Sequence, residues 1–135
     1  MIRAAPTAVL AALLLAGAAG AAPPTYRCGL TQAPPGGAIA GPLVLRLDPD
    51  RGTAQVADPL TRFYAGGPVA ARLARAGQGW RLSWRLDGVQ RAGAAPRVLH
   101  YDARLRDGAL AITARAGRAG TTYRARGQCW PQPAP

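Results

Sequence analysis

Residues 79–87 have the sequence GWRLSWRLD, in which apolar and polar side chains alternate without a break. A period of two is typical of a β-strand, because successive side chains point to opposite faces of a sheet. The two tryptophans and two leucines therefore share one face, while the two arginines, the serine and the aspartate share the other. This segment predicts a strand with an apolar inner face and a polar outer face.

The same alternation recurs on both sides of this segment, and no sustained helical period occurs after residue 21. Alternating runs cover residues 26–30, 43–48, 99–106, 110–114 and 123–129. Two shorter strands are expected at Thr53–Ala57 and Val69–Ala76. Residues Thr31–Pro42 and Pro59–Pro68 are longer than a hairpin needs and are predicted to be loops.

The turns favour hairpins between consecutive strands. Asp107-Gly108 between two alternating runs is a strong hairpin signal. A two-residue turn there would pair Leu105 with Leu110 and Ala103 with Ile112, which keeps apolar side chains on one face. The chain is therefore expected to form about eight short antiparallel strands in up-and-down order.

The N-terminus has the features of a secretory signal peptide over residues 1–21. Arg3 precedes a short apolar run at residues 9–15, and small residues lead to a cleavage site before Ala22. The apolar run is shorter than the roughly 20 residues that span a membrane. We therefore expect an exported chain, periplasmic or extracellular, with no transmembrane segment after cleavage. A single β domain would cover residues 22–130, followed by a Pro-rich tail at residues 131–135.

Export favours a disulfide between the two cysteines, Cys28 and Cys129. Both lie on inward faces of predicted strands, one in the first strand and the other in the last. In an up-and-down sheet these strands lie at opposite edges, so a bond between them requires the sheet to close. The sequence predicts an all-β fold, a small antiparallel up-and-down barrel of about eight strands closed by a disulfide, with a β-sandwich as the alternative.

The charge of the chain is strongly positive. In 135 residues all 17 cationic side chains are Arg and all 6 acidic ones are Asp, giving a formal net charge of +11. Loss of Arg3 with the signal peptide would leave +10. Guanidinium groups bind phosphate and carboxylate bidentately, so an Arg-coated outer face indicates an anionic partner. A solvated coat that keeps the protein soluble is the alternative explanation.

We take Arg81, Arg85, Arg104 and Arg124 as candidate anion-binding residues, because they lie outward on the best-defined strands. The expected partners are anionic envelope components or an acidic protein. Nucleic acid could bind through its phosphates but does not suit an exported protein. Phe63-Tyr64, in a predicted loop, is a second candidate contact, either capping the barrel or anchoring a protein partner as an interaction or inhibitor module.

The sequence does not favour an enzyme. Its only Ser and only His, Ser83 and His100, would share the outer face with Asp102 if their strands pair. A regular sheet face uses its backbone N–H groups in strand pairing, however, which leaves no evident oxyanion hole. Two cysteines and one distant His do not make a closed metal site, and no cofactor is expected.

Tyr26-Arg27-Cys28 near the mature start and Gly127-Gln128-Cys129-Trp130 near the end resemble the layout of the small secreted β-barrel inhibitors of C-type lysozyme. The resemblance covers overall size, export and cysteine placement. That family's inhibitory loop residues have no match here, and a +10 surface would repel a basic lysozyme. We therefore assign no family.

Overall fold

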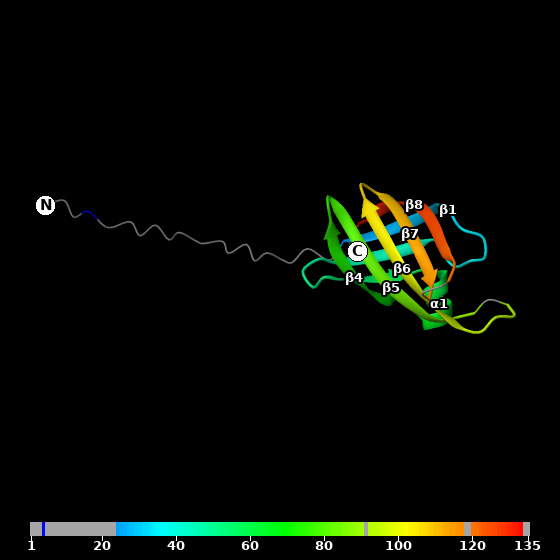
Figure 1. The fold of residues 1–135 in the computed structure, drawn as a ribbon. Helices are drawn as coiled ribbons and strands as arrows, with labels where there is room; N and C mark the ends of the chain where they lie inside the picture. The colour runs from blue at the N-terminus through cyan, green and yellow to red at the C-terminus, as the bar shows by residue number, and fades with distance from the viewer. Residues whose placement is uncertain (1–3, 5–23, 91, 118–119, 134–135) are drawn as a thin grey trace.

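The computed structural model describes residues 4, 24–90, 92–117 and 120–133, and it shows a closed antiparallel barrel of eight strands (Figure 1). Each strand pairs with its neighbours in sequence, and the last pairs with the first. The strands are β1 (Thr25–Gln32), β2 (Leu43–Asp48), β3 (Thr53–Ala57), β4 (Val69–Ala76), β5 (Gly79–Val89), β6 (Arg97–Arg106), β7 (Ala109–Ala116) and β8 (Thr122–Gln132). The predicted barrel is confirmed, and the sandwich alternative is wrong.

The predicted ends of the chain fall largely outside this region. The proposed signal peptide, residues 1–21, is outside the described residues except for Ala4, as are residues 134 and 135 of the proposed tail. Strand β8 continues past Trp130 through Pro131 and Gln132, which pair with β1.

The alternation of apolar residues fills the barrel interior. Leucines of β2, β5 and β6 are almost completely buried, and small inward residues such as Ala103 and Ala114 make room for larger ones. Register places Trp84 of β5 opposite Tyr101 of β6, and their rings stack with centroids 5.1 Å apart. Trp80 shares the inward parity of Trp84 but lies half-buried, with the Arg75 guanidinium 4.4 Å from its ring centroid.

The hairpin predicted at Asp107-Gly108 is present. Both residues have positive φ, 50° and 77°, as a tight turn of this kind requires. The flanking register pairs Leu105 with Leu110 and Ala103 with Ile112, as the sequence predicted. The turn chemistry and the hydrophobic pattern thus specify the same register.

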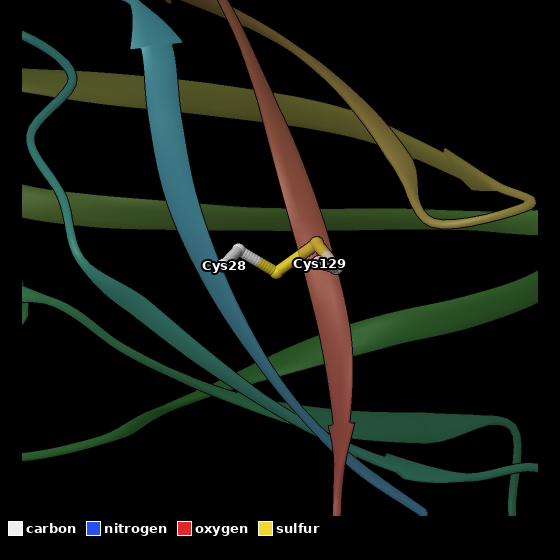
Figure 2. Close-up of a disulfide and its surroundings, with 2 residues drawn as sticks. All are labelled: Cys28 and Cys129. Atoms are coloured by element: carbon white, nitrogen blue, oxygen red, sulfur yellow. A yellow bond between two sulfur atoms is a disulfide. The ribbon is translucent and has the colours of Figure 1, made fainter.

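The Cys28–Cys129 disulfide closes the barrel, as predicted (Figure 2). The two residues are direct partners in the register of β1 and β8, with Cα atoms 4.0 Å apart. Both side chains are buried. A covalent bond therefore lies at the seam where the first strand meets the last.

One predicted loop contains a helix, so that part of the prediction was wrong. Helix α1 (Pro59–Ala65) begins after Asp58, whose side chain accepts a hydrogen bond from the Thr61 backbone N–H at 2.7 Å. The Thr61 hydroxyl in turn accepts a hydrogen bond from the Asp58 N–H, which completes a capping box. Gly66 ends the helix in the left-handed conformation. Seven residues are too few to show a helical period in the sequence.

The two ends of the barrel differ. Short turns at residues 49–52, 77–78 and 107–108 join strands at one end. Longer connections and α1 lie at the other end (Figure 1). There Ala38 and Ile39 of the predicted 31–42 loop are buried, and the Tyr101 hydroxyl donates to the Ala38 carbonyl at 2.7 Å. This segment thus packs into the core.

A basic hollow as the candidate functional site

Strand register arranges the outward side chains in rows across the sheet. Strands β5 and β6 pair, and Ser83 lies opposite Asp102 while Arg85 lies opposite His100. One row runs from β3 to β8 through Thr53, Arg72, Ser83, Asp102, Thr113 and Arg124. The adjacent row contains Arg85, His100 and Arg115. Side chains far apart in the sequence thus form one continuous surface.

This surface contains an open hollow of about 830 Å³, which we call the basic hollow. It extends over β3 to β7, and its lining residues are Thr53, Ala70, Ala71, Arg72, Arg81, Ser83, Trp84, Arg85, His100, Tyr101, Asp102, Thr113 and Arg115. Short outward side chains, chiefly alanine, serine and threonine, alternate there with long arginines. This difference in side-chain length accounts for a hollow on the outer wall of a barrel.

Two arginines of the hollow are held by carboxylates. The Nε and Nη2 atoms of Arg81 both donate to Oδ2 of Asp102, and Asp102 raises the pKa of Arg81. Arg85 donates through the same two atoms to Oδ1 of Asp87, at 3.1 and 2.7 Å. Both pairs are exposed to solvent and contribute little to stability, so their main effect here is to orient the guanidinium groups.

Two other arginines of the hollow lack such partners. Within the described residues, no carboxylate lies within 4.0 Å of Arg72 or Arg115. They stand at opposite sides of the hollow, on β4 and β7, and both are exposed. Since an uncompensated guanidinium readily binds phosphate or carboxylate, these two side chains are the most available anion ligands in the hollow.

The four arginines chosen from the sequence are divided by the structure. Arg81 and Arg85 line the basic hollow, whereas Arg104 and Arg124 are exposed on the same wall but do not line it. The sequence analysis did not select Arg72 or Arg115. Arg72 lies in the Ala-rich strand β4, whose weak β propensity gave little basis for orienting its side chains.

The residues of a hydrolytic triad lie near one another but are not connected as one. The Asp102 carboxylate is bonded to Arg81, and no hydrogen bond joins Ser83 to His100 in the part of the chain that the structure describes. A nucleophile–base hydrogen bond and an orienting carboxylate define such a site. The arrangement therefore offers a mixed polar surface with a hydroxyl, an imidazole and several cations.

Phe63 and Tyr64 of α1 differ in exposure. Phe63 is 79% exposed, whereas Tyr64 packs against the core and donates its hydroxyl to the Gln90 carbonyl at 3.2 Å. Their rings meet edge to face with centroids 4.8 Å apart. Tyr64 thus fastens α1 to the end of the barrel, and Phe63 is left as the outward aromatic residue.

The sequence analysis also missed an exposed tryptophan. Trp130 of β8 is 58% exposed and lies opposite Arg27 of β1, which is in turn opposite Val44 of β2. Its ring lies over Gly29. Trp130 lies at the end of the predicted domain, beyond the last alternating run, so the sequence pattern gave little basis for orienting its side chain.

Among the described residues, no three His, Cys or Asp side chains gather closely enough to hold a metal ion. The same residues contain no helix long and apolar enough to cross a membrane. Comparison with known protein families, curated proteins and solved structures finds no significant match to this chain.

Proposed function

We propose that this protein is an exported, non-enzymatic binding module of the cell envelope that engages an anionic partner through the basic hollow. The observation that carries the proposal is the pair Arg72 and Arg115, which flank one hollow without a carboxylate partner among the described residues. His100, Arg81 and Arg85 add donors between them. The site lies on paired strands, which hold these groups at fixed spacing.

The size of the hollow and the charge of the chain support the same conclusion. Its volume of about 830 Å³ falls within the range of about 300–1,000 Å³ typical of small-ligand sites. The net charge of +10 that remains without Arg3 would attract anions over a distance, but such attraction is screened within about 8 Å at physiological salt. Direct guanidinium contacts are therefore needed for binding that persists in salt.

Three double variants with equal loss of charge test this proposal. Arg72→Gln/Arg115→Gln removes the unpaired cations of the hollow. Arg104→Gln/Arg124→Gln removes the two arginines outside it on the same wall. Arg27→Gln/Arg46→Gln serves as the matched control, because β1 and β2 lie across the barrel from β5 and β6.

Binding of the oxidised protein is measured to anionic lipid vesicles, polygalacturonate and polyphosphate, from low salt to 0.15 M. We expect one of these probes to remain bound at 0.15 M salt. The Arg72/Arg115 variant should weaken that binding at least tenfold, because charge-assisted hydrogen bonds contribute about 1.5–3 kcal/mol each. The control should change it less than threefold. Equal losses for all three variants, or no binding at 0.15 M salt, would show that the charge is only a coat.

A second candidate function rests on Phe63. An aromatic side chain that is 79% exposed on a short helix fits a protein-interaction or inhibitor module that uses the α1 segment. Such a contact should depend little on salt and should be lost in Phe63→Ala. Tyr64→Ala would also loosen α1 itself, so Phe63 is the sharper test.

A further inference from the structure

The middle of the basic hollow is not formed by arginines alone. Between Arg72 on β4 and Thr113 on β7, the same row holds Ser83 and Asp102. Ser83, Asp102 and Thr113 are half-buried, so they form the floor of the hollow, while the surrounding arginines are exposed. The hollow therefore has positive sides and a floor of hydroxyl and carboxylate groups.

The floor has unused hydrogen-bonding capacity. In the described part of the chain, the Ser83 and Thr113 hydroxyls have no protein partner, and Asp102 uses only Oδ2 to bind Arg81. A hydroxyl can both donate and accept, whereas an ionised carboxylate only accepts. These three groups are thus complementary to ligand hydroxyls, and because Arg81 neutralises Asp102, the floor has no uncompensated cation to attract an anionic group.

We infer that the ligand of the basic hollow is an acidic saccharide, a sugar chain whose phosphate or carboxylate groups meet the arginines while its hydroxyls meet the Ser83–Asp102–Thr113 floor. This inference rests on the proposed function and specifies the chemistry of the same site. Adjacent strands lie about 4.8 Å apart, so the row from β4 to β7 extends over about 14 Å. That length accommodates a short oligosaccharide.

The alternation of charges distinguishes this ligand from a simple polyanion. A chain with an anionic group at every position, such as polyphosphate, would place charge over the neutral Asp102–Arg81 pair and has no donor for the free Oδ1 of Asp102. An acidic saccharide has uncharged, hydroxyl-bearing positions between its anionic groups. Specificity of this kind arises because a polar group left without a partner penalises the wrong ligand.

The test compares probes with and without hydroxyls at 0.15 M salt, using the full oxidised protein. Trigalacturonate is paired with a polyacrylate oligomer of equal charge, and a phosphorylated oligosaccharide is paired with tripolyphosphate. Neutral galactotriose controls for binding without charge. We expect the acidic saccharide of at least one pair to bind at least tenfold more tightly than its hydroxyl-free counterpart, and the stronger pair identifies carboxylate or phosphate as the anionic group.

Variants of the floor then separate the inference from the proposed function. Ser83→Ala/Thr113→Val removes both hydroxyls without changing charge, and it should reduce the preference for the saccharide to less than threefold, because saccharide binding should fall more than polyanion binding. Thr25→Val, on β1 across the barrel, is the matched control. Asp102→Asn frees Arg81 and adds an amide donor, so it should strengthen polyanion binding more than saccharide binding and narrow the difference between the two affinities.

Each unexpected binding result leads to a different conclusion. Equal binding of saccharide and polyanion, unaffected by either floor variant, would overturn the saccharide inference and leave the anion-binding function standing. Loss of all binding at 0.15 M salt would overturn both. Binding of neutral galactotriose as tight as that of trigalacturonate would contradict the role of the arginines. Unfolding midpoints of the variants establish that each one folds.

Discussion

Removing the Cys28–Cys129 disulfide is expected to destabilise the barrel chiefly through its unfolded state. The bond joins residues 101 positions apart and so restricts most of the unfolded chain. In the chain-entropy model, closing a loop of about 100 residues contributes about 4.7 kcal/mol to the free energy of unfolding. Domains of this size have total stabilities of about 5–15 kcal/mol, so the bond accounts for a large share.

The folded state should change little when the bond is cut. Backbone pairing of β1 with β8 extends along both strands and does not depend on the sulfur atoms. Both cysteines are buried, so reduction leaves their thiols in the core without opening a cavity. Cys28→Ala/Cys129→Ala removes the sulfur atoms as well and should cost about 1 kcal/mol more for each cavity of methyl size.

Urea unfolding, monitored by tryptophan fluorescence, measures these differences in the free energy of unfolding, because Trp84 is buried against Tyr101 and reports on the core. With a slope of about 2 kcal/mol per molar urea, a loss of about 4.7 kcal/mol lowers the midpoint by roughly 2 M. Free energies are compared rather than midpoints, since the reduced chain exposes more surface on unfolding. If reduction lowers the free energy of unfolding by less than about 1 kcal/mol, loop closure is not the source of the bond's stabilisation.

Three further substitutions and one control, Gly67→Ala, test individual contacts. Burial raises the pKa of Asp58 above its ordinary value of 3.8, so the folded state favours the protonated carboxyl group. The stability gained in this way is fully present below pH 3.8 and is lost as the pH rises through the raised pKa. Asp58→Asn retains a cap acceptor without the charge. Its free energy of unfolding in urea, relative to that of the native chain, should therefore increase as the pH is raised from 3 to 7. A difference in free energy that does not change with pH would contradict this. Gly127→Ala would overlap a carbonyl oxygen of β1 and should cost about 1–3 kcal/mol, whereas Gly67→Ala, with open space around it, should be neutral by thermal unfolding. Tyr101→Phe leaves the Ala38 carbonyl without its donor and should cost about 1 kcal/mol in the same assay; no loss would mean that water replaces the hydroxyl.

The barrel could be predicted from sequence because two independent signals agree. Alternation in residues 79–87 and in the other strands fixes which side chains point inward, and Asp107-Gly108 fixes one hairpin register. The cysteines then require the two edges to meet. Helix α1 could not be found in this way, since its seven residues contain less than two full periods and its signal is limited to the cap at Asp58.

The basic hollow could be predicted only in part. The sequence indicates that Arg81 and Arg85 point outward, but their pairing with Asp102 and Asp87 depends on side-chain positions that a pattern does not specify. The hollow itself depends on five strands and on which outward residues are short. Arg72 was missed because the register of β4 with β5 had no turn signal as strong as that between β6 and β7.

Packing in the core and placement of the site are two consequences of one register. Trp84 stacks on Tyr101 inside the barrel, and the same pairing sets Ser83 opposite Asp102 and Arg85 opposite His100 outside. A shift of one residue in strand register would move every inward side chain of the strand to the surface and bury arginines, which would strongly destabilise the fold. The hydrophobic core therefore holds the outward groups at fixed spacing, although it does not touch them. A ligand that binds the hollow would meet a preformed backbone surface, so its binding should require ordering of arginine side chains but little rearrangement of the backbone.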